Sequence, residues 1–269
     1  MNSLEFAWWI RRHAIEMTHL GNSSHIASVL SIADILGVLY TDILNIDKDN
    51  INNELRDRLI LSKGHAGAGI YASLALKGFI PEEELLTHSQ NGSRLSAHVS
   101  HKNVPGVELS TGSLGHGLSV GAGMALAGKM DKKEYNVYVI VGDGECDEGS
   151  VWEAVLFANQ FKLDNLTLII DHNKMQSLTW CEETISLGSL KDKFECFGWD
   201  VRNIDGHNHK ELKEALESKH KDNKPKCIIA NTIKGKGISF MENNIVWHYR
   251  SPQGEDYTNA IAELETKRP

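Results

Sequence analysis

The segment 135–177 constrains the fold of this 269-residue chain more than any other stretch. It opens with alternating Val, Tyr and Ile residues over 136–141, a composition typical of a buried strand. Residues 150–161 carry apolar side chains at steps of three and four, which predicts a helix. A second apolar strand is predicted over residues 166–170. A strand, a helix and a strand in this order form a right-handed unit whose two strands are parallel.

Polar side chains follow each of the two predicted strands. The first strand ends at Gly142, Asp143 and Gly144, and the second is followed by Asn173. The two glycines let backbone N–H groups approach a ligand closely. Ligands of open α/β sheets bind at the carboxyl ends of the strands, and a carboxylate with an amide oxygen suits Mg²⁺, which also takes water and phosphate oxygens. We therefore predict a Mg²⁺–diphosphate site, in preference to a tight turn with a loop cap.

Charge and composition exclude several classes of protein. The chain has 28 basic and 36 acidic residues, a net charge of −8, and no block of basic residues, which argues against nucleic acid as a partner. The apolar run 26–40 is interrupted by Ser28, Ser31 and Asp34, so no membrane span is predicted. Four scattered cysteines without a C-x-x-C and the lack of a signal-peptide pattern indicate a reduced, cytoplasmic protein.

The remaining pattern predicts one α/β domain over residues 1–269, because no Ser/Gly-rich linker divides it. Beyond residue 251 the chain is polar, and we expect an exposed helical tail. The pair Trp8 and Trp9 is compatible with a core position or with a protein–protein surface. Further strands are expected over residues 58–65, 199–204 and 226–231, and further helices over residues 4–20, 26–40, 66–76, 81–88, 118–127, 190–197 and 209–219.

Several basic side chains lie where helices are predicted to begin. His25 precedes a helix, and either Ser23 or Ser24 caps that helix or His25 meets a polar ligand. Lys63 and His65 precede a glycine-rich helix start, a position suited to a diphosphate. The alternative is a solvated lysine and a capping histidine.

Two further stretches have features that are typical of binding or catalytic sites. Residues 92–117 form a turn-rich stretch of about 25 residues, and long loops of this kind inside a compact domain usually bind or catalyse. Lys234 follows the predicted strand 226–231 between glycine-flanked turns, which favours phosphate binding. Lys236, in the same turn, is interpreted as a solvated charge.

Five separated motifs resemble the diphosphate-binding half of transketolases, and the resemblance covers about residues 5–250. They are GDGE..EGSVWEA with N-K-M-Q downstream, RLILSKGHAGAGIYA, S-T-G-S-L-G, the T-I-K-G-K-G turn and the Trp247-His248 pair. The resemblance implies a doubly wound, mostly parallel sheet with helices on both faces, the thiamine diphosphate-binding fold. One departure is His116, where the family commonly has Gln.

The resemblance also implies a ligand set for thiamine diphosphate and its Mg²⁺, for which Ca²⁺ or Mn²⁺ can substitute. The metal ligands would be Asp143, Asn173 and the backbone carbonyl of Met175. The residues expected to contact the cofactor are Lys63, His65, Gly112, Ser113, Leu114, Gly142, Asp143, Gly144, Glu145, Asn173 and Lys234.

The histidines are expected at the sugar substrate. The resemblance places His25, His98 and His248 there, with His101 as an alternative to His98. They would form hydrogen bonds and transfer protons to hydroxyls and to the developing alkoxide.

Full-length transketolases are more than twice as long as this chain, and their second domain binds the pyrimidine ring and supplies the activating glutamate. The resemblance therefore implies the N-terminal subunit of a split transketolase that transfers a two-carbon unit between sugars or sugar phosphates. A separate C-terminal subunit would supply the second domain. Two cofactor sites would meet at a dimer interface near Glu148, giving a heterotetramer.

Two alternatives remain open. One is a subunit of another thiamine diphosphate enzyme, similar to deoxyxylulose-phosphate synthase or to a 2-oxo-acid dehydrogenase. The other is a catalytically silent paralogue.

Overall fold

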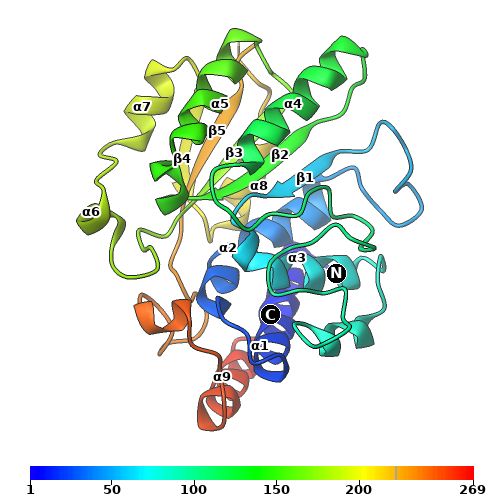
Figure 1. Ribbon diagram of the computed structural model, residues 1–269, viewed down its shortest axis with the longest axis vertical. Coiled ribbons are helices and arrows are strands. Elements are labelled where there is room, and N and C mark those ends of the chain that lie inside the picture. Colours follow the sequence, from blue (N-terminus) through cyan, green and yellow to red (C-terminus); the bar gives the residue numbers. More distant parts are fainter. Residues whose placement is uncertain (222) are drawn as a thin grey trace.

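The computed structural model describes residues 1–221 and 223–269, and these form a five-stranded parallel sheet (Figure 1). The strand order is β1-β2-β3-β5-β4, and every neighbouring pair is parallel. The strands are β1 (Arg58–Leu61), β2 (Val137–Gly142), β3 (Leu166–His172), β4 (Asp200–Asp205) and β5 (Lys226–Asn231). All five predicted strands are thus observed, and their predicted bounds agree with the observed bounds to within a few residues.

The helices account for most of the remaining chain. The α-helices are α1 (Ser3–Leu20), α2 (Ile26–Val38), α3 (Gly67–Leu76), α4 (Gly117–Met130), α5 (Gly149–Gln160), α6 (Cys181–Thr184), α7 (Leu190–Cys196), α8 (His209–Glu217) and α9 (Glu255–Thr266). Shorter helical turns are η1 (Leu39–Ile43), η2 (Gly64–Ala66), η3 (Glu82–Thr87), η4 (Gly144–Asp147) and η5 (Ile245–His248). The helix expected over residues 81–88 is the 3-10 turn η3.

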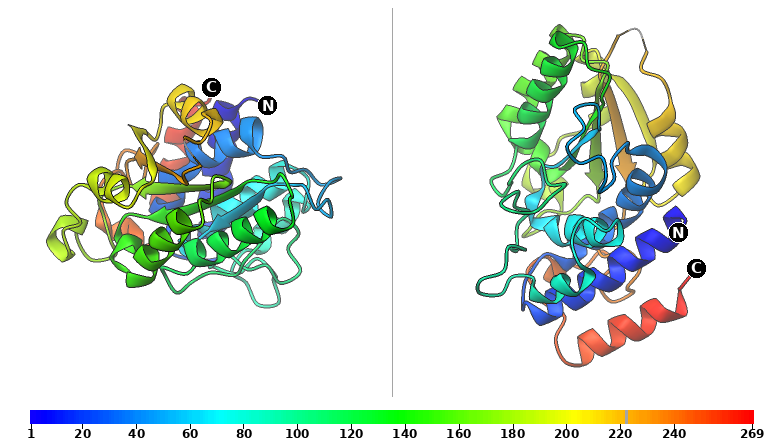
Figure 2. Two further views of the ribbon diagram at one scale, coloured as in Figure 1. Left: turned by 90° about the horizontal axis from the view of Figure 1, so that it is seen from above. Right: turned by 90° about the vertical axis from the view of Figure 1, so that its right-hand side faces the viewer.

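Helices cover both faces of the sheet (Figure 2). Side chains alternate along a strand, so Val139 of β2 faces one layer and Ile140 faces the other. Helices α4, α5 and α7 pack on the first face, and α1, α2, α3 and α8 contribute to the core on the second. The predicted doubly wound α/β fold is confirmed by this arrangement.

Helix α2 occupies the centre of the second layer. The segment Ile26–Ile43 is long and apolar enough to cross a membrane by length and composition alone, but 83% of it is buried inside the protein. It packs between α1 and α3. Its apolar composition is therefore explained by burial on every side.

The C-terminal segment differs from the expected exposed tail. Helix α9 does form, but it packs along α1, as the right-hand view of Figure 2 shows. Ala260 and Leu264 are buried in this contact, and the indole N–H of Trp8 donates to the carbonyl of Leu264 at 2.9 Å. The prediction of an exposed tail was wrong because the few apolar residues of this polar segment fall on one helix face. The same contact places Trp8 in the core.

Truncating the buried leucine of α9 tests this packing. Leu264→Ala is expected to lower the free energy of unfolding by about 2–5 kcal/mol, because a buried leucine is replaced by a cavity. Urea unfolding followed by circular dichroism measures the loss. Asn259→Ala on the exposed side of the same helix is the control and should change stability by no more than about 0.5 kcal/mol. Equal effects of the two substitutions would show that α9 does not pack as described.

Candidate active site

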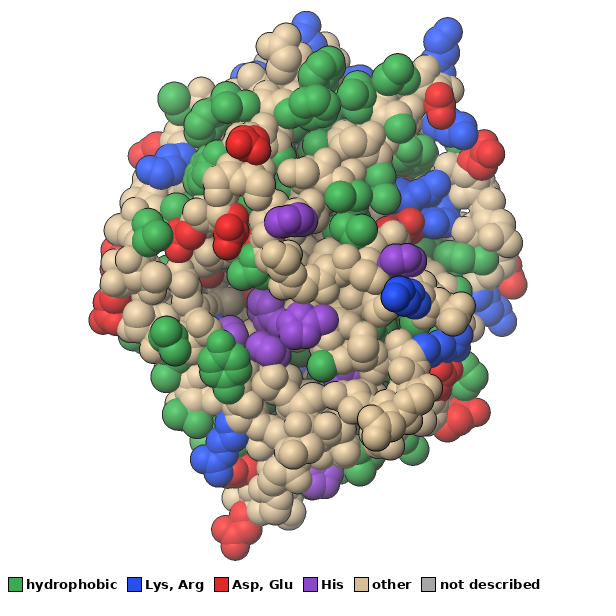
Figure 3. All heavy atoms as spheres, viewed as in Figure 1, with side chains coloured by type: hydrophobic (Ala, Val, Ile, Leu, Met, Phe, Trp, Pro, Cys, Tyr) green, Lys and Arg blue, Asp and Glu red, His purple; other side chains and the backbone are tan. Residues whose placement is uncertain are grey.

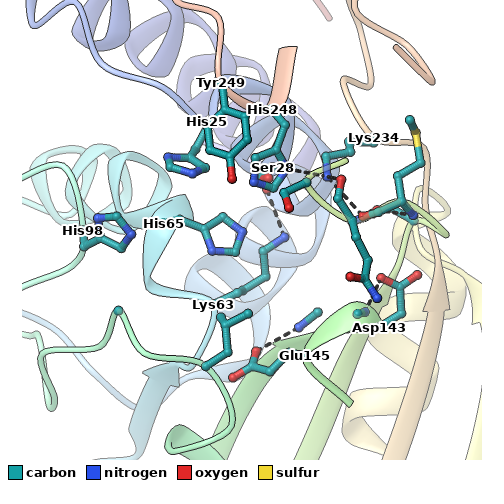
Figure 4. Close-up of a pocket in the computed structure, with 18 residues that line it drawn as sticks. His25, Ser28, Lys63, His65, His98, Asp143, Glu145, Lys234, His248 and Tyr249 are labelled. Atoms are coloured by element: carbon teal, nitrogen blue, oxygen red, sulfur yellow. Dashed lines mark hydrogen bonds between the residues drawn. The ribbon is translucent and has the colours of Figure 1, made fainter. Parts of the chain in front are cut away.

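The carboxyl ends of four strands meet at one cavity of about 220 Å³ (Figure 4). Lys63 and His65 follow β1, Asp143 follows β2, Asn173 follows β3 and Lys234 follows β5. This is the edge at which open parallel sheets bind ligands. The lining residues are His25, Ser28, Lys63, His65, His98, Gly112, Leu114, Gly142, Asp143, Gly144, Glu145, Asn173, Met175, Gln176, Ser177, Lys234, His248 and Tyr249.

Asp143 is a buried carboxylate, only 3% exposed, at one side of this cavity. Its oxygens accept hydrogen bonds from the backbone N–H groups of Gly144, at 2.8 Å, and Lys174. Burial and the nearby charge of Asp171 raise the pKa of Asp143. Its ionised form is therefore costly in isolation and would be stabilised by a cation.

The neighbouring oxygens suit a hard divalent cation. The amide oxygen of Asn173 and the carbonyl of Met175 come from the segment directly after β3. The carbonyl of Met175 already accepts a hydrogen bond from the Lys234 ammonium at 3.1 Å, so it faces positive charge. Within residues 1–221 and 223–269, no cluster of three His, Cys, Asp or Glu side chains is arranged to hold a metal. A site of one carboxylate and two neutral oxygens fits Mg²⁺, which completes its coordination with water and phosphate.

A buried ion pair lies beside these oxygens. The ammonium of Lys63 contacts Asp171 at 2.5 Å and also donates to the carbonyl of Ser28 at 3.2 Å. Asp171 accepts further hydrogen bonds from Ser31, at 2.7 Å, and from the Asn173 amide, at 2.8 Å. Burial acts to raise the pKa of Asp171, but the charge of Lys63 and the hydrogen bonds from Lys63, Thr232 and Ser31 hold it below its usual range. Sequence reasoning gave Asp171 no role, although an acid at the end of an apolar strand was a usable signal.

Lys234 is the second buried cation of the cavity. Its ammonium donates to the carbonyls of Met175 and Gln176, each at 3.1 Å, and lies 2.8 Å from Nδ1 of His248. Burial and the neighbouring charge of Lys63 lower the pKa of Lys234 to about 8. Two ammonium groups in one small cavity favour an anionic ligand.

Four histidines form the opposite side of the cavity, and Figure 4 shows Lys63 between them and Asp143. The ring centroid of His25 lies 5.1 Å from that of His65, 5.6 Å from that of His98 and 5.0 Å from that of His248. Figure 3 shows histidine side chains gathered at the centre of this face, beside a hollow. Imidazoles at this spacing can contact several hydroxyl groups of one small polyol.

The environment keeps three of these imidazoles neutral, those of His25, His65 and His248. Burial and nearby positive charge lower the pKa of His25 to about 4 and that of His248 to about 3. Burial and the charge of Lys63 also place the pKa of His65 well below its usual value. At neutral pH each ring therefore offers one donor and one acceptor.

The backbone at His25 explains its orientation. His25 has φ +76°, in the left-handed region, and its N–H donates to the carbonyl of His248 at 2.9 Å. Among the described residues no side chain caps α2, so the alternative of Ser23 or Ser24 as its cap is wrong. Instead, the Ser24 hydroxyl lies 2.7 Å from Nδ1 of His25. A left-handed non-glycine residue is strained, and such residues concentrate at functional sites.

Glu145 ties the turn-rich loop 92–117 to the cavity. This carboxylate is 2% exposed, and it accepts from the N–H groups of Gly115, at 2.8 Å, and Gly142, at 3.1 Å. It also accepts from the hydroxyl of Ser62. Through these bonds the loop presents Gly112 and Leu114 to the cavity.

Three residues considered in the sequence analysis lie away from the cavity. Ser113 is exposed and falls outside the lining among the residues that the structure describes. His101 is also exposed, and its Nδ1 lies 2.7 Å from the Ser110 hydroxyl, so the geometry favours His98. Nδ1 of His116 lies 2.7 Å from the carbonyl of Leu114.

Four other lining residues were given no role in the sequence analysis. Ser28, Gln176, Ser177 and Tyr249 all border the cavity. The ring of Tyr249 lies 4.8 Å from that of His248 and 5.7 Å from that of His25, at the open end of the cavity. Tyr249 directly follows the Trp247-His248 pair, which was the available signal.

A parallel sheet with an acid–amide pair and two lysines at its carboxyl edge identifies an α/β protein whose edge cavity suits a diphosphate. A family model described as "Transketolase, thiamine diphosphate binding domain" matches residues 4–265. The chain belongs to the transketolase family and corresponds to this domain. The sequence-based prediction of the family is thereby confirmed.

Two similar relatives have about the same length as this chain. One is named as a subunit of the apulose-4-phosphate transketolase of Phocaeicola vulgatus, and it is 42% identical over 96% of this chain and 92% of the relative. The other is the 6-deoxy-6-sulfo-D-fructose transketolase subunit SqwG of Clostridium sp., 44% identical over 95% of this chain and 94% of the relative. Both names describe subunits, in agreement with the prediction of a transketolase subunit.

Solved transketolases share the fold. The enzyme from Campylobacter jejuni superposes with a TM-score of 0.91 at 32% identity, and the match covers 98% of this chain. The enzyme from Leishmania mexicana gives a TM-score of 0.89 at 27% identity. This chain spans 43% and 41% of those two chains, respectively.

The neutral histidines predict a loss of stability in mild acid. Between about pH 6.5 and pH 4 the unfolded chain takes up protons on His25 and His248, whereas the folded chain does not. Lowering the pH from 7 to 5 should therefore reduce the free energy of unfolding, and His25→Phe or His248→Phe should reduce that loss. Urea titrations at the two pH values measure it. His101→Phe, outside the cavity, is the control and should lose as much free energy of unfolding between pH 7 and pH 5 as the wild type. If the two cavity variants lose as much as this control, the assignment is contradicted.

Proposed function

We propose that this chain is the N-terminal subunit of a split, thiamine diphosphate-dependent transketolase. It would transfer a two-carbon ketol unit from a ketose or ketose phosphate to an aldose or aldose phosphate. The observation that carries the proposal is the cavity itself. One end of it is lined by Asp143, Asn173 and the two lysines, and the opposite end is lined by histidines of the same chain. The first end suits a metal-bound diphosphate, and the second suits a polyol.

At the first end, Asp143, Asn173 and the carbonyl of Met175 would hold Mg²⁺, or Ca²⁺ or Mn²⁺ in its place. Lys63 and Lys234 would neutralise the diphosphate. The loop residues Gly112 and Leu114, together with His65, would border the cofactor, as would Gly142, Gly144 and Glu145, whereas the exposed Ser113 lies outside the lining among the described residues. When bound, thiamine diphosphate supplies a nucleophilic carbon for making and breaking bonds next to a carbonyl.

At the second end, His25, His98 and His248 would orient the sugar. An imidazole in its neutral form can donate to one sugar oxygen and accept from another hydroxyl, as the low pKa values of His25 and His248 allow. The names of both relatives include a sugar with an anionic group, which is a phosphate in one name and a sulfonate in the other. We therefore propose ketoses with a terminal anionic group as donors.

A second chain would complete the site. It would bring the pyrimidine-binding domain and the glutamate that activates the cofactor, and two copies of each chain would form a heterotetramer in the cytoplasm. The relatives named as subunits support a partner chain. Exposed Glu148, at the N-terminus of α5, would lie at the dimer interface, with residues 1–269 acting as one domain.

Removing the charge of Asp143 tests the cofactor end. Asp143→Asn should weaken Mg²⁺-dependent binding of thiamine diphosphate at least about a hundredfold, because loss of even an indirect metal contact costs about 10–100-fold. Isothermal titration calorimetry with and without EDTA measures the affinity. Asp57→Asn is the matched control, since Asp57 is a buried carboxylate at the opposite edge of the sheet, bonded to the N–H groups of Asn45 and Asn136. Unchanged affinity in Asp143→Asn would rule out the metal assignment.

The histidine end is tested by turnover. This chain is purified with its native partner, and the complex is assayed with xylulose 5-phosphate, apulose 4-phosphate, 6-deoxy-6-sulfo-D-fructose and pyruvate as donors. Ketol transfer from a ketose is expected, and His248→Gln should lower turnover about a hundredfold or more while the affinity for thiamine diphosphate stays near that of the wild type.

The donor panel also separates the alternatives. Turnover of pyruvate with none of the three ketoses would identify a different thiamine diphosphate enzyme. A complex that binds the cofactor and turns over no donor would indicate a silent paralogue.

A further inference from the structure

A buried polar cluster lies behind the loop that carries Lys234. It joins Arg11 of α1, Asp34 of α2, His207 after β4 and His209 of α8. Among the described residues, these four side chains fall outside the cavity lining. The proposed function therefore leaves the cluster without a role.

Asp34 is the shared acceptor of this cluster. The Arg11 guanidinium donates to both of its oxygens, at 3.0 and 2.6 Å. Nδ1 of His207 lies 2.7 Å from one oxygen, and Nε2 of His209 lies 3.1 Å from the other. Burial acts to raise the pKa of Asp34, but Arg11 and the two histidines hold it well below its usual range. Asp34 is therefore an ionised acceptor, and both histidine nitrogens that face it must donate.

These contacts fix the tautomer of His207. Its Nδ1–H donates to Asp34, and its Nε2 accepts from the backbone N–H of Ile233 at 2.8 Å. A neutral imidazole has one donor and one acceptor, so both ring nitrogens are satisfied only in the Nδ1–H form. Ile233 directly precedes Lys234.

The loop 232–237 is held at two further points, one by the cluster and one by the backbone of α2. Nε of Arg11 donates to the carbonyl of Lys236 at 3.1 Å. The N–H of Gly235 donates to the carbonyl of Ala27 at 3.0 Å, and Gly235 has φ +84°. A side chain at Gly235 would meet the carbonyl oxygen of Met241 at 2.2 Å, so the turn allows only glycine. The loop thus has one tight conformation, fixed from the side away from the cavity.

That conformation sets where Lys234 points. The side chain is 2% exposed and reaches across the cavity to the carbonyls of Met175 and Gln176 and to His248. A shift of the backbone at Ile233 moves the base of this side chain, because the two residues are adjacent. A lysine ammonium is a point charge, so its effect on a diphosphate depends on its position.

We propose that His207 is a positioning residue, which bridges Asp34 and the Ile233 amide as the Nδ1–H tautomer and thereby sets the position of the Lys234 ammonium. The part of this inference that concerns the diphosphate rests on the proposed function. The part that concerns the loop conformation stands on its own contacts.

Three variants of the full chain separate positioning from general stability. The amide of Gln reaches the place of Nε2, so His207→Gln keeps an acceptor for Ile233. The shorter amide of Asn reaches the place of Nδ1, so His207→Asn keeps only the contact with Asp34. His209→Asn is the matched control, because His209 bonds the same carboxylate but its other nitrogen meets the hydroxyl of Ser3 at 2.9 Å.

The readouts are amide exchange at Ile233, the melting temperature and the affinity for thiamine diphosphate with Mg²⁺. In His207→Asn the Ile233 amide should exchange about tenfold faster and the cofactor should bind about tenfold more weakly, as for one lost hydrogen bond. His207→Gln should stay within about threefold of the wild type on both measures. His209→Asn should lose melting temperature and change neither measure. Equal effects of His207→Asn and His209→Asn on exchange would overturn the proposal.

A spectroscopic test needs no variant. Long-range ¹H–¹⁵N correlation spectra of the wild-type chain should show His207 as the Nδ1–H tautomer, and the Nε2–H tautomer or an imidazolium would overturn the proposal. If the wild-type chain in complex with its partner binds no thiamine diphosphate, the proposed function fails, while the exchange and tautomer data still decide the role of His207.

Discussion

The architecture of the cavity depends on one buried carboxylate. Asp171 ends β3 and accepts hydrogen bonds from Lys63 after β1, Ser31 of α2 and Thr232 after β5. A buried charge is stable only when it is paired and fully hydrogen-bonded, so these segments cannot move apart independently. The fourth donor is the amide nitrogen of Asn173, whose amide oxygen accepts from the backbone N–H of Met175 at 3.1 Å. A single side chain thus fixes the ends of three strands and one helix.

The charge balance of the cavity follows from this arrangement. Lys63 is compensated by Asp171, whereas Lys234 donates to neutral carbonyls and Asp143 accepts from backbone N–H groups. Within the described part of the chain, the cavity therefore holds the Lys234 ammonium and the carboxyl groups of Asp143 and Glu145 without direct ionic partners. In the proposed function, a diphosphate would supply the charge opposite to Lys234, and its metal ion the charge opposite to Asp143. Pre-arranged charges of this kind avoid reorganisation when the ligand binds.

Much of this was predictable from sequence, for identifiable reasons. The strand–turn–helix–strand unit, Asp143 and Asn173 are close in sequence, and the rule for carboxyl ends of parallel strands brings them together. The position of Asp171 near the end of an apolar strand was a usable signal, but its partners were not predictable, because they come from distant segments that only the tertiary structure brings into contact. Tyr249 was missed although it directly follows the Trp247-His248 pair, because its packing against His25 and His248 is a tertiary contact. The packing of α9 was missed because only a few apolar side chains determine it.

The hydrogen bond between the N–H of His25 and the carbonyl of His248 has a consequence for how the protein is made. The histidine end of the cavity combines His25, near the N-terminus, with His248, near the C-terminus. Likewise, Trp8 of α1 is covered by α9. Contacts between such distant segments form late and slow folding. During synthesis the sheet can form before either contact exists. The histidine end of the cavity is therefore expected to be among the last parts of the chain to assemble.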